Sequence, residues 1–434
     1  MFQEMPRDIA YVMNGFPRLS ETFITNEIHL LEQLGIRLRL ISVKRENESK
    51  KHGVVDAIRA PLLYLPAVTS LSGRHLLGWL LDNAGVFVSS HLRIVRRRPL
   101  AYFTVLCSAL AMCWRYRRTP LEPRKVFLKE FMQAGYIAAY IIDSGTVRHL
   151  HGHFCHGVAT ITWFASQLSG IPFSFTAHAK DIYQADLNPG DLLSRKLSAA
   201  TFVATCTGAN HQHLSARFPH YKRIHTVYHG LDTRYFSPAT GRAKDGQPPL
   251  LLAVGRLVEK KGFSYLVEAC ALLKRTSLPF RCLIVGEQGN DSERIARMIE
   301  EHGLSEQMHI RDAVTQDELR ALYRQAAIFA LPCQVTEAGD RDGIPNVLAE
   351  AMAMAIPVVT TPISGIPELV NDGQNGLLVA SQDGKALAMA IETLLRDPEL
   401  GARLGKAARQ TICERFDSRQ TTLALRDLFI SAVG

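Results

Sequence analysis

Short apolar runs alternate with amphipathic stretches along almost the whole chain. The first run covers residues 9–13 and ends at the turn residues Asn14 and Gly15. Apolar residues then recur at three- and four-residue spacing over 24–34, as on one face of a helix, and residues 38–43 form a second apolar run. The chain therefore opens with a predicted strand, helix and strand, with a loop after the first strand.

The same alternation continues after a change of pattern in the middle of the first half. Residues from about 71 to 140 are largely helical in pattern, and short strands resume at 171–176 and 202–205. Gly, Pro, Ser and charged residues gather over 236–249, as in a linker. Beyond it, predicted strands at 250–254, 282–285, 308–310, 328–331, 357–360 and 376–379 alternate with predicted helices at 263–273, 292–302, 318–326 and 346–354.

This order predicts an α/β protein with two Rossmann-like domains, each a doubly wound parallel sheet. We place the N-terminal domain at 1–238, with the helical insertion at about 71–140, and the second domain at 239–410. We expect the helix of 411–434 to return to the N-terminal domain. Ligands of such sheets lie outside the carboxyl ends of the strands, so two domains facing each other predict a binding cleft.

Composition places the chain among ordinary globular proteins. Of its 434 residues, 47% are hydrophobic and 21% are charged, and its eight cysteines include no C-x-x-C pair. We read no signal peptide at the N-terminus, and no apolar run reaches the ~20 residues that a membrane-spanning helix requires. These features predict a cytoplasmic protein with reduced thiols.

The formal charge of +9 is unevenly placed. Residues 91–130 hold ten basic side chains against two acidic ones, Glu122 and Glu130, and aromatic residues lie among them. This pattern is typical of helices that lie on an anionic membrane surface, so we expect peripheral contact with the inner face of the cytoplasmic membrane. Solvated arginines on ordinary helices are the alternative. Nucleic-acid binding is disfavoured, because no nucleic-acid motif accompanies the cations.

Two segments after the linker carry the candidate chemistry. In the first, Arg256 and Lys261 lie in a loop between a buried strand and a helix, where a fork-shaped and a point-like cation suit a diphosphate. In the second, Gly343 and Ile344 precede a helix and present backbone N–H groups at its start. Glu350 stands in an apolar run on that helix, so its carboxylate requires a partner or a ligand.

These segments resemble the large retaining glycosyltransferase family that has an E-x7-E motif and the two-domain GT-B fold. The resemblance covers nearly the whole chain and rests on Gly-Arg-x4-Lys-Gly at 255–262, on 284–286, 316–323 and 331–332, and on 350–353, 356–359 and 365–368. It implies that Arg256 and Lys261 hold the donor diphosphate and that Glu350 holds the ribose hydroxyls. Asp342, where the family has Glu, is implied to contact the transferred sugar and to take part in catalysis.

The N-terminal half looks like the branch that builds bacterial exopolysaccharides of the colanic acid kind. Residues 16–24 and 173–183 carry this likeness. It implies that His178 is the catalytic histidine of an H-x-x-D motif that ends at Asp181, and that Gly15 donates to the diphosphate where many relatives have two glycines.

Two patterns suggest metal ions, and we predict a metal in neither. Asp340-Arg341-Asp342 spells the D-x-D of metal-dependent glycosyltransferases, but those have a single-lobed fold, and Asp342 already occupies the E-x7-E position. Four histidines lie close together at 149, 151, 153 and 156, where a strand runs into a loop, without a carboxylate among them to complete a tetrahedral site.

The resulting hypothesis is metal-free transfer, with retention and without a cofactor, of a hexosyl group from a nucleotide diphosphate sugar to a lipid-linked oligosaccharide. We expect a UDP-sugar as the donor, although base and sugar are not written in these motifs. The alternatives are an epimerase or a phosphorylase on the same fold, and a binding protein without catalysis.

Overall fold

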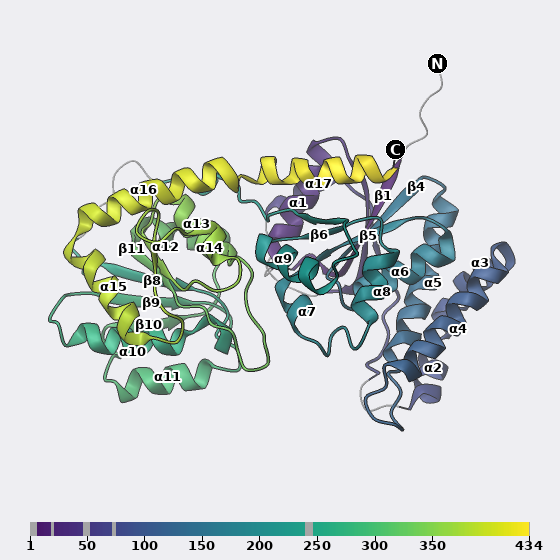
Figure 1. The fold of residues 1–434 in the computed structure, drawn as a ribbon, viewed down its shortest axis with the longest axis horizontal. Coiled ribbons are helices and arrows are strands. Elements are labelled where there is room, and N and C mark those ends of the chain that lie inside the picture. Colours follow the sequence, from purple (N-terminus) through teal and green to yellow (C-terminus); the bar gives the residue numbers. More distant parts are fainter. Residues whose placement is uncertain (1–6, 19–20, 47–52, 72–74, 239–245, 434) are drawn as a thin grey trace, which may run out of the picture. The chain divides into compact units, whose positions relative to one another are not determined.

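The computed structural model describes residues 7–18, 21–46, 53–71, 75–238 and 246–433 (Figure 1). The chain folds into two compact units. Unit 1 comprises residues 1–206, 211–227 and 422–434, and unit 2 comprises residues 207–210 and 228–421. Residues 239–245 of the predicted linker lie outside the described residues.

Unit 1 is built on a parallel sheet of seven described strands. They run β1 (Asp8–Phe16), β2 (Arg37–Arg45), β3 (Leu62–Tyr64), β4 (Val147–His153), β5 (Phe173–Ala177), β6 (Val203–Thr205) and β7 (Ile224–Thr226). Their order in the sheet is β3-β2-β1-β4-β5-β6-β7, so the order reverses between β1 and β4. This reversal point is where doubly wound sheets place their ligands.

Helices pack on both faces of this sheet. They are α1 (Thr22–Gln33), η2 (Gly53–Ala57), α2 (Leu76–Asn83), α3 (Gly85–Arg97), α4 (Pro99–Arg115), α5 (Val126–Ser144), α6 (Val158–Ser169), α7 (Ala179–Tyr183), α8 (Leu192–Ala199), α9 (Gly208–Arg217) and α17 (Ser418–Val433). Successive residues of β1 point to opposite faces of the sheet. On one face, Ala10 and Val12 join the core with α4, α5 and α6. Ile9, Tyr11 and Met13 join a second core with α1 and α17.

The stretch of about 71–140, predicted as a helical insertion, contains α2 to α4 and most of α5. The loop predicted at Asn14 and Gly15 is wrong, because β1 continues through both residues to Phe16 and Gly15 pairs with Lys44 of β2. A Cβ at Gly15 would lie 2.2 Å from Oε1 of Glu46, so a larger residue there would require the Glu46 side chain to move. Glycine was read as a turn signal, whereas its smallness serves a close approach inside the sheet.

Unit 2 is a second parallel α/β fold. Its strands are β8 (Leu250–Val254), β9 (Arg281–Val285), β10 (Met308–Arg311), β11 (Ala326–Leu331), β12 (Val358–Thr360) and β13 (Leu377–Leu378). Its helices are η3 (Glu259–Lys261), α10 (Phe263–Lys274), α11 (Ser292–Glu301), α12 (Gln316–Gln325), α13 (Asn346–Ala353), α14 (Ile366–Leu369), α15 (Gly384–Arg396) and α16 (Pro398–Arg415). The sheet order is β10-β9-β8-β11-β12-β13, with its reversal between β8 and β11.

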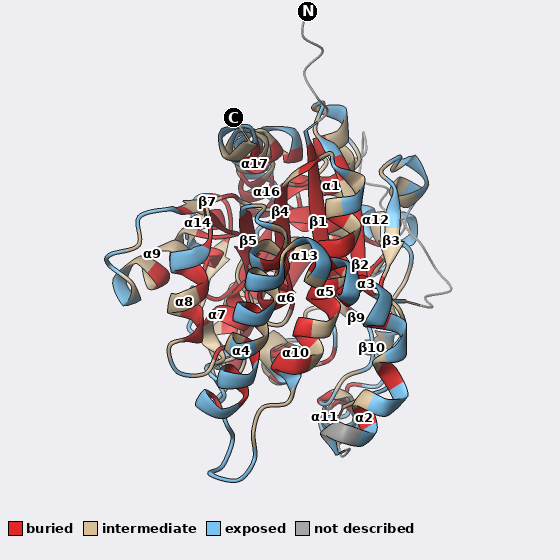
Figure 2. Ribbon diagram, turned by 90° about the vertical axis from the view of Figure 1, so that its right-hand side faces the viewer, coloured by how far each residue is buried: buried red, intermediate tan, exposed pale blue. Residues whose placement is uncertain are grey.

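The expected sequence signals shape these elements. Thr315 and Glu318 form a capping box at the start of α12, with each side chain accepting from the backbone N–H of the other. The central strands of both sheets are buried (Figure 2). Among the described helices, none is long and apolar enough to cross a lipid bilayer.

Candidate functional site

The loop that leaves β8 is held in place by tight backbone packing. A Cβ at Gly262 would lie 1.9 Å from the carbonyl oxygen of Pro332, at the end of β11, and Gly262 has a φ of +67°. Only glycine allows both this approach and this backbone conformation. The loop after β8 and the loop after β11 are therefore packed against each other at the reversal point of the sheet. This contact brings Lys261 close to Asp342.

Lys261 and Asp342 form a close and largely buried ion pair. Their Nζ and Oδ2 atoms are 2.7 Å apart, and the two side chains are only 13% and 16% exposed. Burial alone would raise the pKa of Asp342, but Lys261 and Lys260 hold it down to about 2. Burial lowers the pKa of Lys261, but Asp342 outweighs it and raises that pKa. Both groups are therefore charged at neutral pH.

Lys260 extends this pair into a network. Its Nζ lies 3.3 Å from Oδ1 of Asp342 and 3.3 Å from Oδ1 of Asp340. The two acids of the D-x-D pattern are thus each paired with a lysine. Arg256 lies close enough to lower the pKa of Lys261, is itself exposed, and has no ion-pair partner in the part of the chain that the structure describes. Its guanidinium is therefore available to an anion from solvent.

The start of α13 supplies backbone donors beside these cations. Pro345 is the N-cap residue, one position before the helix, and Gly343 and Ile344 are half-buried just ahead of it. The described residues offer no acceptor to the N–H of Gly343 or Ile344, while the Gly343 carbonyl accepts from Gly365 at 3.3 Å. Free N–H groups at a helix start attract anions.

Glu350 lies on α13 and is buried, with 6% exposure. Its partner in the protein is Tyr323 of α12, whose hydroxyl donates to Oε2 at 2.9 Å. Burial raises the pKa of Glu350 to about 7, although the Tyr323 hydrogen bond opposes this. The predicted need for a partner is confirmed, and the carboxylate is held ready to accept further hydrogen bonds.

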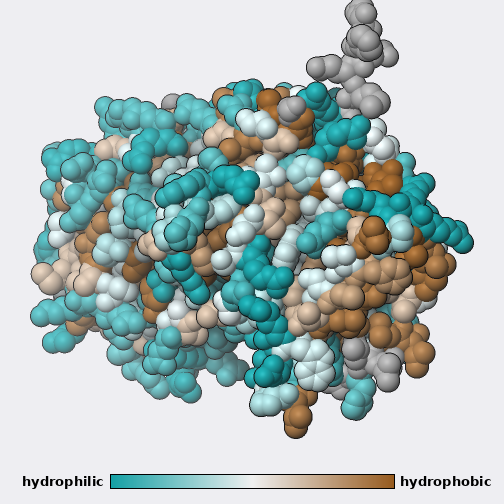
Figure 3. Space-filling view, turned by 45° about the vertical axis from the view of Figure 1, so that its right-hand side comes forward, coloured by the Kyte–Doolittle hydropathy of each residue, from teal (hydrophilic) through white to brown (hydrophobic). Residues whose placement is uncertain are grey.

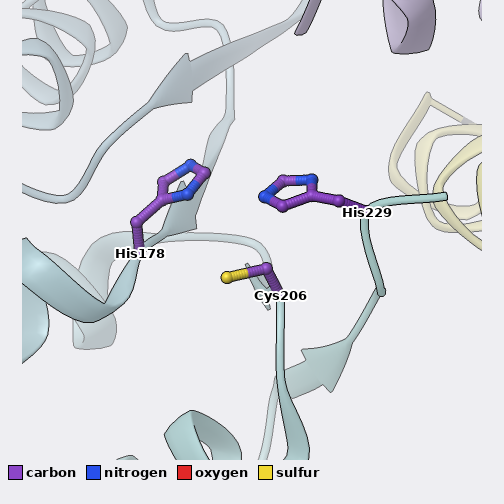
Figure 4. Close-up of side chains that lie close together, drawn as sticks. All are labelled: His178, Cys206 and His229. Carbon is purple, nitrogen blue, oxygen red and sulfur yellow. The ribbon is translucent and has the colours of Figure 1, made fainter. Parts of the chain in front are cut away.

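The remaining candidates, Gly15 and His178, belong to unit 1. His178 is the N-cap residue of α7, and its backbone N–H donates to Oδ1 of the buried Asp181 at 2.8 Å, so both ends of the H-x-x-D motif shape one turn. The His178 ring lies between the rings of Phe23 and Phe154, with centroids 5.5 and 4.4 Å away. Cys206, which follows β6, brings its sulfur within 4.8 Å of a His178 ring nitrogen (Figure 4).

Three of the four clustered histidines belong to a polar core. His149, His151 and His153 alternate along β4 and face the core that also contains Phe202 and Phe429. Ser174 and Thr176 of the neighbouring strand bind both ring nitrogens of His151 at 2.8 and 3.0 Å, and Ser174 binds Nε2 of His149 at 2.7 Å, while Nδ1 of His149 has no partner among the described residues. Burial lowers the pKa of His149 to about 4 and that of His151 well below 6.5, so both are neutral.

The arginines of the 91–130 stretch are more engaged than their sequence shows. Arg93 and Arg97 both pair with Asp143 of α5, and Arg115 pairs with Asp191 at 2.7 Å. Both acids lie outside the stretch, so counting charges within it overstated the free positive charge. The alternative of arginines on ordinary covering helices accounts for these three.

Sequence reasoning assigned no role to Lys260, Tyr323 or Cys333. Cys333 follows β11, and its thiol points at Oδ2 of Asp342 over 3.7 Å. Tyr323 ends one of the segments that carried the family resemblance, but its partner is 27 residues away. A signal for Lys260 was available in the doubled lysine of the β8 loop.

Comparison with known proteins agrees with this architecture. Residues 240–411 match the family model "Glycosyl transferases group 1". The chain is 26% identical to the colanic acid biosynthesis glycosyltransferase WcaL of Salmonella typhimurium over 97% of this chain and 98% of WcaL. Two crystal structures share its fold, each with a TM-score of 0.68. One is a glycosyltransferase of Rickettsia africae, which is 18% identical, with 98% of this chain and 99% of that chain covered. The other is Anabaena HepE in complex with UDP and glucose, which is 15% identical, with 98% of this chain and 100% of that chain covered. The chain therefore contains a group 1 glycosyltransferase domain on the GT-B fold and is homologous to WcaL over nearly its whole length.

Proposed function

We propose that the protein transfers a hexosyl group, with retention, from a nucleotide diphosphate sugar to a hydroxyl of a lipid-linked oligosaccharide in exopolysaccharide biosynthesis. The observation that carries the proposal is the juxtaposition, at the reversal point of the unit 2 sheet, of the Lys261–Asp342 pair and the exposed Arg256. WcaL is named for colanic acid biosynthesis and HepE was crystallised with UDP and glucose, which supports a UDP-sugar donor and a polysaccharide product.

The charges suggest how a donor is held. The diphosphate takes Arg256 and Lys261 as counter-charges, together with the free N–H groups of Gly343 and Ile344. Lys261 then exchanges its bond to Asp342 for one to phosphate, and the released carboxylate turns to the sugar hydroxyls. Glu350 accepts from the ribose hydroxyls, which is the role that its buried and proton-sensitive carboxylate suits.

In the transfer step the acceptor oxygen forms a bond to the anomeric carbon as the bond from that carbon to the diphosphate breaks. The acceptor proton passes to the leaving diphosphate oxygen on the same face of the sugar, which retains the configuration. Arg256 and Lys261 stabilise the negative charge that develops on the diphosphate. From the family resemblance we propose that His178 of unit 1 is also catalytic and that Gly15 contributes to donor binding. These cations supply the charge that a metal would otherwise supply, so we propose that transfer is metal-independent.

Transfer from labelled UDP-sugars to lipid-extracted acceptors tests this proposal, with the products identified by mass spectrometry. Replacing Arg256 or Glu350 by Ala should nearly abolish transfer, while Arg275→Ala, an exposed arginine at the end of α10, serves as the control. Normal rates in both site variants, or loss of wild-type activity on chelation, would rule out the site as described. An epimerised donor or a sugar phosphate as product would favour the rival enzyme classes.

We further propose that α4 docks the protein on the inner face of the cytoplasmic membrane. This helix is apolar on two sides: one face joins the core, and the other is exposed and carries apolar side chains at four- and three-residue spacing, namely Phe103, Cys107, Leu110 and Trp114. Brown apolar surface gathers over the insertion (Figure 3). Arg96 and Arg117 are exposed at its margins, which suits anionic lipids.

Co-sedimentation with vesicles of phosphatidylglycerol or phosphatidylcholine measures this docking. The double variant Leu110→Ser, Trp114→Ser should lose most binding to the anionic vesicles. Met389→Ser, which removes an equally exposed apolar side chain from α15, should keep it. Equal binding of both variants would show that this face of α4 does not contact lipid.

A further inference from the structure

A chain of buried polar side chains runs from α1 to His178 in unit 1. His153 Nδ1 lies 3.3 Å from His178 Nε2, and His153 Nε2 lies 3.1 Å from Oε1 of Glu27. His153 is fully buried, and His178 is 9% exposed. The hydroxyl of Tyr11 donates to the same Glu27 oxygen and also contacts His153 Nε2. Buried polar groups connected this way have few alternative arrangements.

Four elements of the fold build this chain. Tyr11 comes from β1 and His153 from the end of β4, the two strands between which the sheet order reverses. Phe23 and Glu27 are four residues apart on α1 and so share one helix face. Phe23 packs its ring against both histidines, with centroids 6.3 and 5.5 Å away, while Glu27 reaches His153.

The neighbouring carboxylate on α1 is otherwise engaged. Burial raises the pKa of Glu21, and His153 is near enough to lower it. Arg18, however, binds the Glu21 carboxylate at 2.8 Å. Asp181 is occupied by the backbone N–H groups of His178 and Cys155. Of the carboxylates in the described chain, Glu27 is thus the one at hydrogen-bond distance from His153.

The hydrogen bonds fix where the protons lie. Burial and the Glu27 carboxylate raise the pKa of Tyr11 well above 10.0, so its hydroxyl remains a donor. An ionised Glu27 accepts from Tyr11 and also from a proton on His153 Nε2. With its proton on Nε2, His153 has an unprotonated Nδ1, which accepts from His178 Nε2–H. His178 is left as the Nε2–H tautomer, with Nδ1 facing the backbone N–H of Asp181 as in a capping box.

We infer that Glu27 and His153 are positioning residues that fix the ring orientation and the tautomer of His178. The inference rests on the proposed function, in which His178 is catalytic. A carboxylate that orients a histidine through its second nitrogen is a recurring way to set which nitrogen carries the proton. Here a second histidine stands between the carboxylate and the histidine that it orients.

The test combines a spectroscopic and a kinetic measurement on the full chain. Nitrogen NMR of protein labelled with ring-¹⁵N histidine reports which nitrogen of His178 is protonated, with the signal assigned by its absence from His178→Ala. In Glu27→Gln the amide can donate to His153 Nε2, which shifts the proton to His153 Nδ1 and reverses the His178 tautomer. We expect this reversal together with a loss of about 10–100-fold in kcat and a change in donor KM below about 3-fold.

Two further variants make the result decisive. Glu32→Gln removes the same charge five residues further along α1, where Glu32 accepts from the backbone N–H of Arg59 and from no other described residue, and it should leave both measurements unchanged. If Glu27→Gln does not fold, His153→Phe keeps a buried ring while removing the acceptor of His178 Nε2–H, and it should give the same loss of kcat.

Three outcomes would overturn the inference, and they separate it from the proposed function. An unchanged His178 signal in Glu27→Gln overturns it even where His178→Ala abolishes transfer. A kcat in Glu27→Gln equal to that of Glu32→Gln does the same. Normal transfer by His178→Ala removes the role of His178 itself, which is a failure of the proposed function, and the NMR signal then shows whether the hydrogen-bond chain nevertheless exists.

Discussion

Glu350→Gln should make unit 2 more stable in alkaline solution and should lower its affinity for nucleotides. The carboxyl of Glu350 has a pKa of about 7 in the folded protein against an ordinary value of 4.5, because it is buried. The folded state therefore binds more protons than the unfolded state between these two values. Stability falls as the pH rises from about 4.5 to about 7 and stays low above that.

The size of this effect follows from the two pKa values. A difference of about 2.5 units corresponds to about 3 kcal/mol, which is the cost of keeping an ionised Glu350 buried at pH 8. Glutamine removes this cost and still accepts from Tyr323, but it buries an amide donor that lacks an acceptor, at about 1 kcal/mol. The variant should gain about 2 kcal/mol at pH 8, whereas at pH 5, where an ionised Glu350 costs the wild type only about 1 kcal/mol, the two proteins should be about equally stable.

Scanning calorimetry at pH 5 and pH 8 measures this. A gain of about 2 kcal/mol corresponds to a rise of roughly 4–8 °C in the unfolding temperature of a domain of this size. Glu300→Gln, an exposed glutamate on α11, is the control and should shift neither transition. UDP should stabilise the wild type much more than Glu350→Gln. An equal shift of Glu350→Gln at both pH values would refute the assignment of a protonated, buried carboxyl.

Three further predictions concern the packing and charges of unit 2. Gly262→Ala should lower the free energy of unfolding in urea by more than about 2 kcal/mol. Gly303→Ala should lower it by only about 1 kcal/mol, because Gly303 has a similar φ but the atom nearest to an added Cβ is 3.7 Å away. Lys261→Met should lower the free energy of unfolding by up to about 3 kcal/mol, because it leaves Lys260 as the remaining cation beside the buried Asp342, and adding Asp342→Asn should recover part of that loss in a double-mutant cycle. Asp383→Ala should lower the free energy of unfolding by about 1 kcal/mol, because the Asp383 side chain caps α15 by accepting from the Ala386 N–H. Equal stability of the two glycine variants would contradict the first prediction, and additive effects in the double-mutant cycle would contradict the second. An unchanged stability of Asp383→Ala would contradict the third.

The sequence was sufficient for the six strands of unit 2 and for α10 to α13 because each of these elements has a local signal, whereas α14, α15 and α16 were not predicted. Its apolar runs, the capping box at Thr315 and the basic loop after β8 are all properties of neighbouring residues. The same holds for the position of Arg256 and Lys261 in the loop after β8.

Partners that are distant in the chain escaped prediction. The pairing of Asp342 with Lys260 and Lys261 depends on how the β8 and β11 loops meet, which no local pattern encodes. Tyr323 could not be matched with Glu350 for the same reason. Gly15 was misread as a turn because a glycine that permits a loop and one that permits a close approach look alike in sequence.

The most direct test of the central claim, a donor site formed by the β8 loop and the start of α13, is calorimetric titration of the full chain with UDP, GDP, ADP and CMP in the presence of chelator. We predict that one nucleoside diphosphate binds and that Arg256→Ala weakens its binding about 10–100-fold, the loss expected for charge-assisted hydrogen bonds to phosphate. Arg275→Ala should bind like the wild type. Binding of none of these nucleotides, or equal affinity in Arg256→Ala and Arg275→Ala, would contradict the account.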